Sequence, residues 1–379
     1  MCILAKTFII DYTYANFIIM KRTVFALAVS LAAMMTLSSC GSKAEEEKSD
    51  PVLFRFTSDC EDEKVGFMDS SGNVVIKPQF DWAGDFSEGM AWVEAMGSDN
   101  IMYGFIDTTG TIVIKPQFSE VGDFSNGLAR VRVGDDDNGK EGYVDKTGRF
   151  VINPQYGDAG DFSEGLAWIR VGDWKDGKYG YIDTTGKVVI EPRFDWVGDF
   201  SEGMAWFREG DAGNGKYGFI DKTGNVVIKP QYDRVSEFSE GMAVIIEGKF
   251  TDSKSGYIDK TGNVVIKPQY EEVRDFSEGL ASVKINGKVG FIDKTGKVVI
   301  QPQFVYAGDF SDGLALVQVV NGGTGRYGYI DKTGKMVVSP QFIDGSVGFK
   351  NGLAYVYKEG GVRGWIDRTG KFIWSISCE

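Results

Sequence analysis

The sequence predicts an all-β fold, a tandem array of about nine three-stranded antiparallel units arranged as a propeller-like or superhelical β-repeat. One segment recurs nine times and reads Gly, an aromatic or apolar residue, usually Ile, then Asp, two polar residues and Gly. The copies are spaced by 38 residues with two shorter steps of 34 and 36, and a Val-Val-Ile-rich run follows each. Units of this size cannot bury an apolar face alone and must stack on their neighbours. The opening glycines are Gly66, Gly104, Gly142, Gly180, Gly218, Gly256, Gly290, Gly328 and Gly364.

The copy at 165–194 shows how one unit is built. Alternating residues predict strands at 166–171, 179–183 and 187–190, with a polar loop between the first two. A tight turn joins the second strand to the third, since Asp183 can accept a backbone N–H and Gly186 can adopt a positive φ. An aspartate in register in every copy is therefore expected to form turns rather than to bind a metal.

The third strand and the link that follows it predict how units stack. A Val-Val-Ile run such as 188–190 is apolar on both faces, so we expect neighbouring sheets to cover both. Eight of the nine prolines follow this run, where they end the strand or mark a sheet edge. The link then carries Phe-Ser-Glu-Gly or a variant, as at 200–203, and its aromatic residue is expected to plug the seam between units.

These units resemble the WG repeat family of bacteria. The match includes Gly180-Tyr181-Ile182-Asp183, Gly186, Pro192, Phe194 and the link 200–205, and it extends from about residue 52 to 374. The Trp that names the family is absent before the opening Gly. The resemblance implies an all-β repeat protein, often at the cell envelope, with no catalytic residues. The residues in the place of that Trp are Val65, Tyr103, Glu141, Tyr179, Tyr217, Ser255, Val289, Tyr327 and Arg363.

The N-terminal segment predicts export. Residues 20–22 are a short basic region, 23–37 are apolar, and Leu37-Ser38-Ser39-Cys40 ends the stretch. Residues 1–39 are thus expected to be a signal peptide, with 1–19 upstream of the true start at Met20. The last four residues resemble the lipobox of bacterial lipoproteins, which implies an acylated Cys40 and a membrane-anchored protein of the cell envelope, at the outer membrane and facing the periplasm or the surface. Residues 40–50 are a polar, lipidated flexible tether, and 51–379 are a single repeat domain.

Composition narrows the functional classes. A net charge of −13 disfavours nucleic acid as a partner. Histidine is absent, which excludes Ser-His-Asp and Cys-His catalysis and His-based zinc sites. No cofactor or metal is expected.

Two cysteines bear on whether the array closes. Cys60 lies in the first unit and Cys378 in the last, and a disulfide between them would require the array to curl back on itself. Nine units exceed the four to eight blades usual in propellers, which argues against closure. A closed ring with this disulfide and an open array with unpaired or intermolecular thiols both remain possible at this stage.

Function is expected at positions that differ between units. Tryptophan is concentrated in the first half of the array and predicts a patch for a glycan, peptide or protein, with packing between units as the alternative. We expect a non-catalytic binding or scaffold module; the alternative is a carboxylate-based glycan-active enzyme on the same β scaffold. The candidate ligand-binding residues are Trp82, Trp92, Trp168, Trp196 and Trp206.

Overall fold

The computed structural model describes residues 50–61, 63–96, 101–135, 138–173, 175–211, 213–248, 253–321, 323–345 and 348–378. The predicted signal peptide, Cys40 and the tether up to residue 49 lie outside this part of the chain. Residues Asp50–Glu379 form one compact unit.

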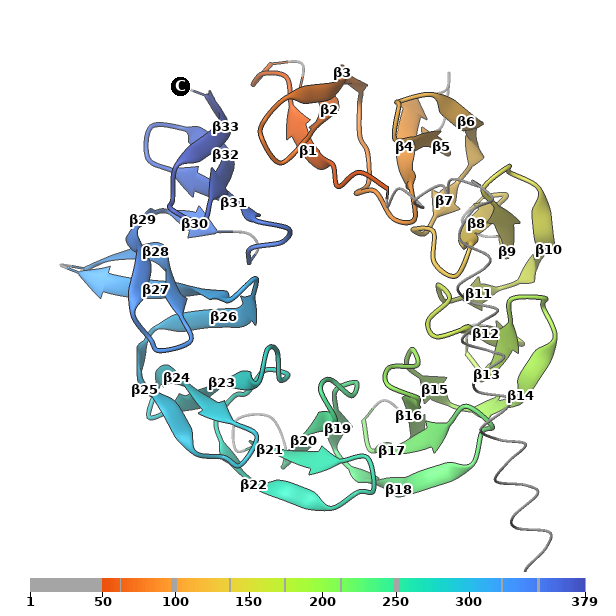
Figure 1. Ribbon diagram of the computed structural model, residues 1–379. Coiled ribbons are helices and arrows are strands. Elements are labelled where there is room, and N and C mark those ends of the chain that lie inside the picture. Colours follow the sequence, from red (N-terminus) through yellow and green to blue (C-terminus); the bar gives the residue numbers. More distant parts are fainter. Residues whose placement is uncertain are drawn as a thin grey trace, which may run out of the picture. The chain divides into compact units, whose positions relative to one another are not determined.

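Nine small antiparallel sheets follow one another around a ring and form a nine-bladed β-propeller (Figure 1). The repeat architecture and the antiparallel meander are confirmed, and the ring is closed rather than superhelical.

The first three blades are β1 (Phe54–Thr57), β2 (Val65–Met68) and β3 (Val74–Phe80); β4 (Met90–Met96), β5 (Ile101–Asp107) and β6 (Ile112–Phe118); and β7 (Glu120–Val121), β8 (Leu128–Val133), β9 (Lys140–Asp145) and β10 (Phe150–Tyr156). The next three are β11 (Asp158–Ala159), β12 (Leu166–Val171), β13 (Lys178–Asp183) and β14 (Val188–Phe194); β15 (Trp196–Val197), β16 (Met204–Glu209), β17 (Lys216–Asp221) and β18 (Val226–Tyr232); and β19 (Arg234–Val235), β20 (Met242–Glu247), β21 (Lys254–Asp259) and β22 (Val264–Tyr270). The last three are β23 (Leu280–Ile285), β24 (Lys288–Asp293) and β25 (Val298–Phe304); β26 (Tyr306–Ser311), β27 (Leu314–Asn321), β28 (Thr324–Asp331) and β29 (Met336–Phe342); and β30 (Asp344–Gly345), β31 (Leu353–Lys358), β32 (Val362–Asp367) and β33 (Phe372–Ser377).

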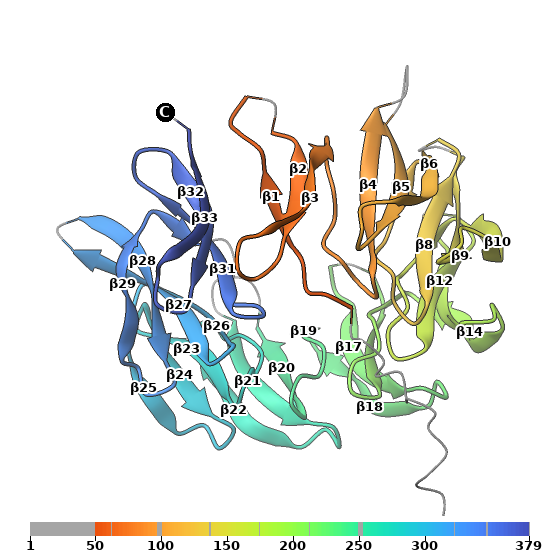
Figure 2. The ribbon, with the colours of Figure 1, turned by 45° about the horizontal axis from the view of Figure 1, so that its top comes forward.

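Most blades contain a fourth, innermost strand that the sequence pattern did not predict. In the fourth blade this is β11, which pairs with β12 next to the central opening, while β14 forms the outer edge (Figures 1 and 2). With two residues, β11 is too short to show an alternating pattern. In the second and seventh blades the inner strand is reduced to single bridges, Ala83 with Val93 and Val273 with Val283.

The expectation that the Val-Val-Ile run is covered on both faces is wrong. In β14, Ile190 is 3% exposed, whereas Val188 and Val189 are 38% and 40% exposed. Neighbouring blades diverge with distance from the centre of the ring, so the outer strand contacts a neighbour on one face only. The strand also continues through Pro192. Proline has no backbone N–H to donate, and at this outer edge no neighbouring strand is present to accept one.

The turn between the second and third long strands both caps its own blade and contacts the preceding one. In the fourth blade the carboxylate of Asp183 accepts the backbone N–H of Thr185 at 2.9 Å and of Lys187 at 3.1 Å, as predicted. Gly186 has φ +85°, and a Cβ there would lie 3.1 Å from the side chain of Ile152 in the third blade. The same contact recurs at all nine seams, where a seam is the interface between consecutive blades: Ile76 with Gly110, Ile114 with Gly148, Ile152 with Gly186, Ile190 with Gly224, Ile228 with Gly262, Ile266 with Gly296, Ile300 with Gly334, Val338 with Gly370 and Ile373 with Gly72.

The link aromatic residues fill the seams, which confirms the prediction. The ring of Phe200 is 1% exposed and lies 4.8 Å from the ring of Tyr181 in the preceding blade. The hydroxyl of Ser163 donates to the carbonyl of Phe200 at 2.7 Å. Each link therefore joins two blades by packing and by a hydrogen bond.

The ninth seam joins blades from opposite ends of the chain. Phe54 and Phe56 of the first blade contact Trp365 and Trp374 of the last, with ring centroids 5.1 Å apart in both pairs. The indole N–H of Trp365 donates to the carbonyl of Arg55 at 2.6 Å. These contacts close the ring without any strand crossing from one blade to the other.

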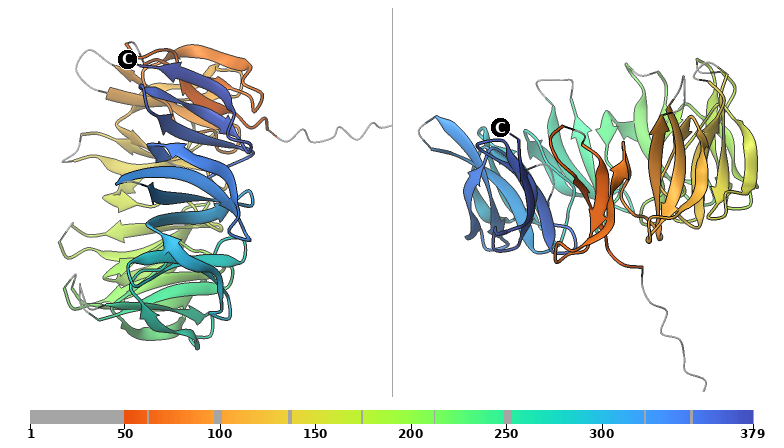
Figure 3. Two further views of the ribbon diagram at one scale, coloured as in Figure 1. Left: turned by 90° about the vertical axis from the view of Figure 1, so that its left-hand side faces the viewer. Right: turned by 90° about the horizontal axis from the view of Figure 1, so that it is seen from above.

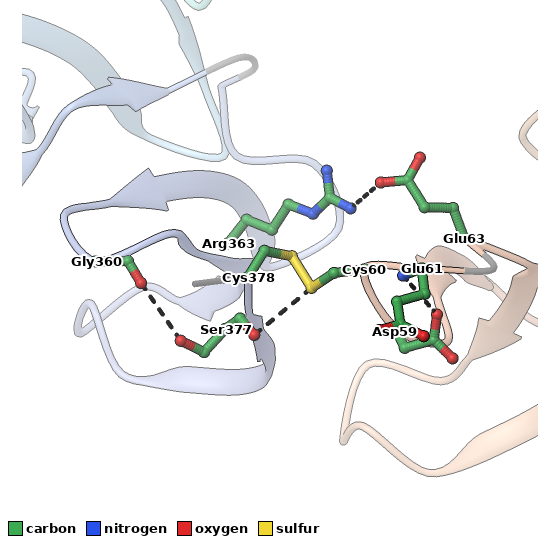
Figure 4. Close-up of a disulfide and its surroundings, with 8 residues drawn as sticks. All are labelled: Asp59, Cys60, Glu61, Glu63, Gly360, Arg363, Ser377 and Cys378. Atoms are coloured by element: carbon green, nitrogen blue, oxygen red, sulfur yellow. Dashed lines mark hydrogen bonds and ion pairs between the residues drawn. A yellow bond between two sulfur atoms is a disulfide. The ribbon is translucent and has the colours of Figure 1, made fainter.

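A covalent bond reinforces this ninth seam. Cys60 and Cys378 form a disulfide with Cα atoms 5.5 Å apart, and Arg363 pairs with Glu63 at 2.6 Å beside it (Figure 4). The bond joins residues 318 positions apart, so it connects the two ends of the β-repeat unit.

The two faces of the ring carry different turns. Because each meander is antiparallel, the hairpins between the two central strands, such as β12 and β13, lie on one face (Figure 3). The Asp-Gly turns and the Ser-Glu-Gly turns of the links lie on the other.

We expect the left-handed Glu of the link to stabilise the seam. Glu202 has φ +53°, which is unfavourable for a residue other than Gly or Asn. Its carboxylate accepts the backbone N–H of Gly241 in the next blade at 2.8 Å and pairs with Lys260 at 3.0 Å. Glu202→Ala should lower the free energy of unfolding by about 1–2 kcal/mol, measured by denaturant titration.

Glu202→Asn is the matched control. Asn126 occupies the equivalent place two blades earlier, and its side-chain oxygen accepts the N–H of Gly165 at 2.5 Å. The Asn variant should therefore lose less stability than the Ala variant. Equal losses in both variants would contradict a role for the seam hydrogen bond.

Candidate functional site

Three positions on neighbouring strands differ from seam to seam. In the fourth blade they are Trp168 on β12 and Tyr179 on β13, and Trp196 on β15 of the fifth blade faces them across the seam. Trp168 and Tyr179 have ring centroids 5.6 Å apart, and Tyr179 and Trp196 are 4.9 Å apart. Tyr179 thus lies between two indoles, and we call this arrangement the aromatic seam.

Three of the candidate tryptophans pack against a tyrosine of their own blade: Trp92 on Tyr103, Trp168 on Tyr179 and Trp206 on Tyr217. The indole of Trp168 lies on Gly160 of its own blade so closely that a Cβ on that glycine would be 2.2 Å from the indole nitrogen. Trp168 also lowers the pKa of Asp199 in the next blade. Trp92 on Gly84 and Trp206 on Gly198 repeat the close contact with glycine.

The other two candidate tryptophans are open to solvent. Trp82 is 54% exposed and Trp196 is 45% exposed. The guanidinium of Arg208 lies 5.9 Å from the Trp196 ring. The structure therefore does not gather the five tryptophans into one patch: Trp92, Trp168 and Trp206 are partly buried, while Trp82 and Trp196 have surface available for a ligand.

At the seam between the third and fourth blades, charged side chains stand in place of the aromatic pair. Arg130 stands in the place of Trp168 and contacts Glu141 at 2.8 Å and Asp161 at 3.3 Å. Burial raises the pKa of the Glu141 carboxyl group, and the charge of Arg130 opposes that rise. Because both partners are present, the buried charge is compensated.

Two later seams are hollow. Ser282 and Val289 occupy the places of Trp168 and Tyr179 in the seventh blade, and a cavity of about 420 Å³ opens there. A second cavity of about 400 Å³ lies at the next seam, where Leu316 replaces the tryptophan. Arg274 and Tyr306 line both cavities. The comparison of units singled out the tryptophans, but the signal for these hollows was a side chain smaller than tryptophan at the same position, Ser282 or Leu316.

The links carry acidic residues whose pKa values are raised by burial. In Figure 1 the segments that join each inner strand to the next long strand project into the central opening. Burial, and next the charge of Asp161, raise the pKa of Asp199, while the hydrogen bond from Trp168 lowers it. Burial likewise raises the pKa of Asp123, Glu237 and Asp309 in the corresponding links.

Neither a metal centre nor a membrane-spanning helix is found within the described ranges. No group of three or more Asp, Glu, His or Cys residues there could hold a metal ion. The same residues include no helix with the length and apolar character needed to cross a bilayer.

The raised pKa of Asp199 predicts how its charge affects stability. A carboxyl group whose pKa lies above its ordinary value of 3.8 destabilises the fold when ionised, and the effect disappears as pH falls through the raised pKa toward 3.8. Asp199→Asn keeps an acceptor for Trp168. It should therefore melt at a higher temperature than the native protein near pH 7, with a difference that shrinks toward pH 4 in thermal scans.

Asp183→Asn is the control with the opposite sign. A hydrogen bond from Thr185 is the largest cause that lowers the pKa of Asp183, so its charge stabilises the fold above pH 3.8 and that contribution is lost as pH falls below this value. This variant should melt at a lower temperature near pH 7. A pH-independent effect of Asp199→Asn would contradict the electrostatic interpretation.

One comparison with a solved structure agrees with the fold. The chain is 13% identical to a eukaryotic initiation factor of known crystal structure, with a TM-score of 0.60 over 87% of this chain and 96% of that one. The designed protein Ika8 is 16% identical, with a TM-score of 0.43 over 72% and 92% of the two chains. BamB from Moraxella catarrhalis is 11% identical, with a TM-score of 0.39 over 69% and 88%. No curated protein matches the sequence.

The model of the WG containing repeat matches eight stretches of the sequence. Each stretch begins in the second long strand of one blade and ends in or just beyond the first long strand of the next, so each repeat spans one seam. The matched residues are 66–95, 103–135, 142–173, 179–211, 217–249, 256–288, 290–322 and 327–361. The chain therefore belongs to the WG containing repeat family.

Proposed function

We propose that this protein is a cell-envelope lipoprotein whose propeller is a non-catalytic binding or scaffold module for a protein, peptide or glycan. A propeller-like domain of WG repeats fits a binding or scaffold role. The finer proposal adds the membrane anchor through Cys40 and the class of partner. The lipobox-like sequence before Cys40 supports the anchor.

The observation that supports binding is the contrast between repeated and variable seam positions. The Ile-Gly contacts and the link hydrogen bonds recur around the ring and hold it together. The variable positions include exposed Trp82 and Trp196 on inner segments and the hollows lined by Tyr306. Exposed aromatic rings give a large contact area at a low entropic cost.

A non-catalytic role is preferred because the acidic residues of the links occupy repeated positions. Raised pKa values would suit a general acid, so Asp199 and Asp309 keep the alternative of a carboxylate-based glycan-active enzyme open. However, Asp199 is half-buried, and Trp168 of the preceding blade lowers its pKa. A group held in the same way in several copies is better explained as part of the scaffold.

The anchor is tested by metabolic labelling with palmitate in a bacterial host. The full-length protein should incorporate the label and fractionate with the membrane, whereas Cys40→Ser should lose both properties. An unlabelled native protein would contradict the lipoprotein assignment.

Binding is tested with the immobilised domain, residues 49–379, against a glycan array and an envelope extract. A defined component should be retained by the native domain and lost by the Trp82→Ala/Trp196→Ala double variant, whose folding is checked by circular dichroism because Trp196 also contacts Tyr179. A component retained equally by both would contradict binding through these tryptophans. Hydrolysis of an arrayed glycan, abolished by Asp199→Asn, would favour the enzyme alternative.

A further inference from the structure

The hollow between the seventh and eighth blades lacks a ring that the aromatic seam contains. In the aromatic seam Tyr179 lies between Trp168 and Trp196. In the seventh blade Val289 occupies the position equivalent to Tyr179. Across the seam, Tyr306 of the eighth blade occupies the position equivalent to Trp196.

Arg274 takes part of the place of the missing indole. The glycine under each packed indole, such as Gly160, cannot carry a Cβ without contacting the indole nitrogen. Arg274 holds that position in the seventh blade, so a tryptophan at 282 would collide with it. Its guanidinium lies 3.2 Å from the hydroxyl of Tyr306 and 5.4 Å from the centre of that ring.

The remaining space adjoins a flat ring and has a mixed lining. Val273 and Val289 contribute apolar side chains to the cavity of about 420 Å³, and Arg274, Ser282 and Lys284 contribute polar atoms. Tyr306 is 36% exposed. An aromatic ring could contact both the tyrosine and the valines, as Tyr179 contacts its neighbours in the aromatic seam.

Charged groups at the cavity are largely paired with one another. Lys284 contacts Glu272 at 3.0 Å, and Arg274 lies 3.8 Å from Asp309. A strongly charged ligand would have to compete with these pairs. The place left open beside Tyr306 is the one that a tyrosine ring fills in the aromatic seam, which favours an aromatic guest over a glycan.

We propose that this hollow binds a tyrosine or tryptophan side chain of a partner polypeptide, which would take the place that Tyr179 fills in the aromatic seam. The inference rests on the proposed binding function and names the partner's chemistry. The guest ring lies beside Tyr306 and within reach of the Arg274 guanidinium, which favours aromatic faces.

The test titrates the full mature protein with a fluorinated N-acetyltyrosinamide, observed by fluorine NMR. A probe of this size should bind at roughly millimolar concentration. Val289→Tyr restores the ring present in four other blades and should weaken binding at least about tenfold by filling the space. Val289→Ile is the matched control and should stay within about twofold of the native protein.

A second variant keeps the test informative if Val289→Tyr fails to fold. Tyr306→Ala removes the flat ring without filling the hollow and should weaken binding about fivefold, the effect of losing one aromatic contact. Equal binding by the native protein, Val289→Tyr and Tyr306→Ala would overturn the inference. So would binding of diacetylchitobiose at this hollow without binding of the tyrosine probe, because the site would then take glycans.

The outcomes separate this inference from the proposed function. If an envelope component is retained equally by the native domain and Val289→Tyr, and the probe does not bind, the inference fails while the binding function stands. If the probe binds in a Val289-dependent manner but no envelope component is retained, the chemistry of the hollow stands and the broader function fails.

Discussion

The structure depends on one constraint: no blade can cover its own faces, so every blade needs a neighbour on each side. The ring meets this constraint with one contact repeated nine times, in which an Ile or Val of an outer strand packs on the turn glycine of the next blade. At eight of the seams the chain passes from one blade to the next inside a matched repeat. The ninth, between Ile373 and Gly72, has no repeat to join it and must form between the two ends of the domain.

This division explains where specificity can arise. The turn Gly, the turn Asp and the link Phe hold every seam together. Substitutions at these positions are therefore expected to destabilise the ring and not to give one seam a surface of its own. The positions occupied by Trp168 and Tyr179 tolerate change because each seam can be completed in more than one way. One seam uses tilted aromatic rings packed on one another, another uses Arg130 with Glu141, and a third leaves a hollow beside Tyr306.

The sequence predicted the features that recur in every unit and missed those that depend on local geometry or differ between units. The meander, the Asp183 turn and the buried link aromatics follow from period and residue type, because each recurs in register. The inner strand β11 was missed since two residues carry no alternation. The exposure of Val188 was missed because periodicity describes a strand and does not describe how blades diverge in a ring. The hollow required three-dimensional knowledge that Ser282 and Val289 border the same space.

Closure of the ninth seam is the central claim, and its covalent bond offers the most direct test. Non-reducing proteolysis of the freshly isolated mature protein, followed by mass spectrometry, should recover one crosslinked peptide pair containing Cys60 and Cys378 from a monomeric species. Two free thiols, or the same pair recovered only from a covalent dimer, would contradict a ring closed through its own chain ends.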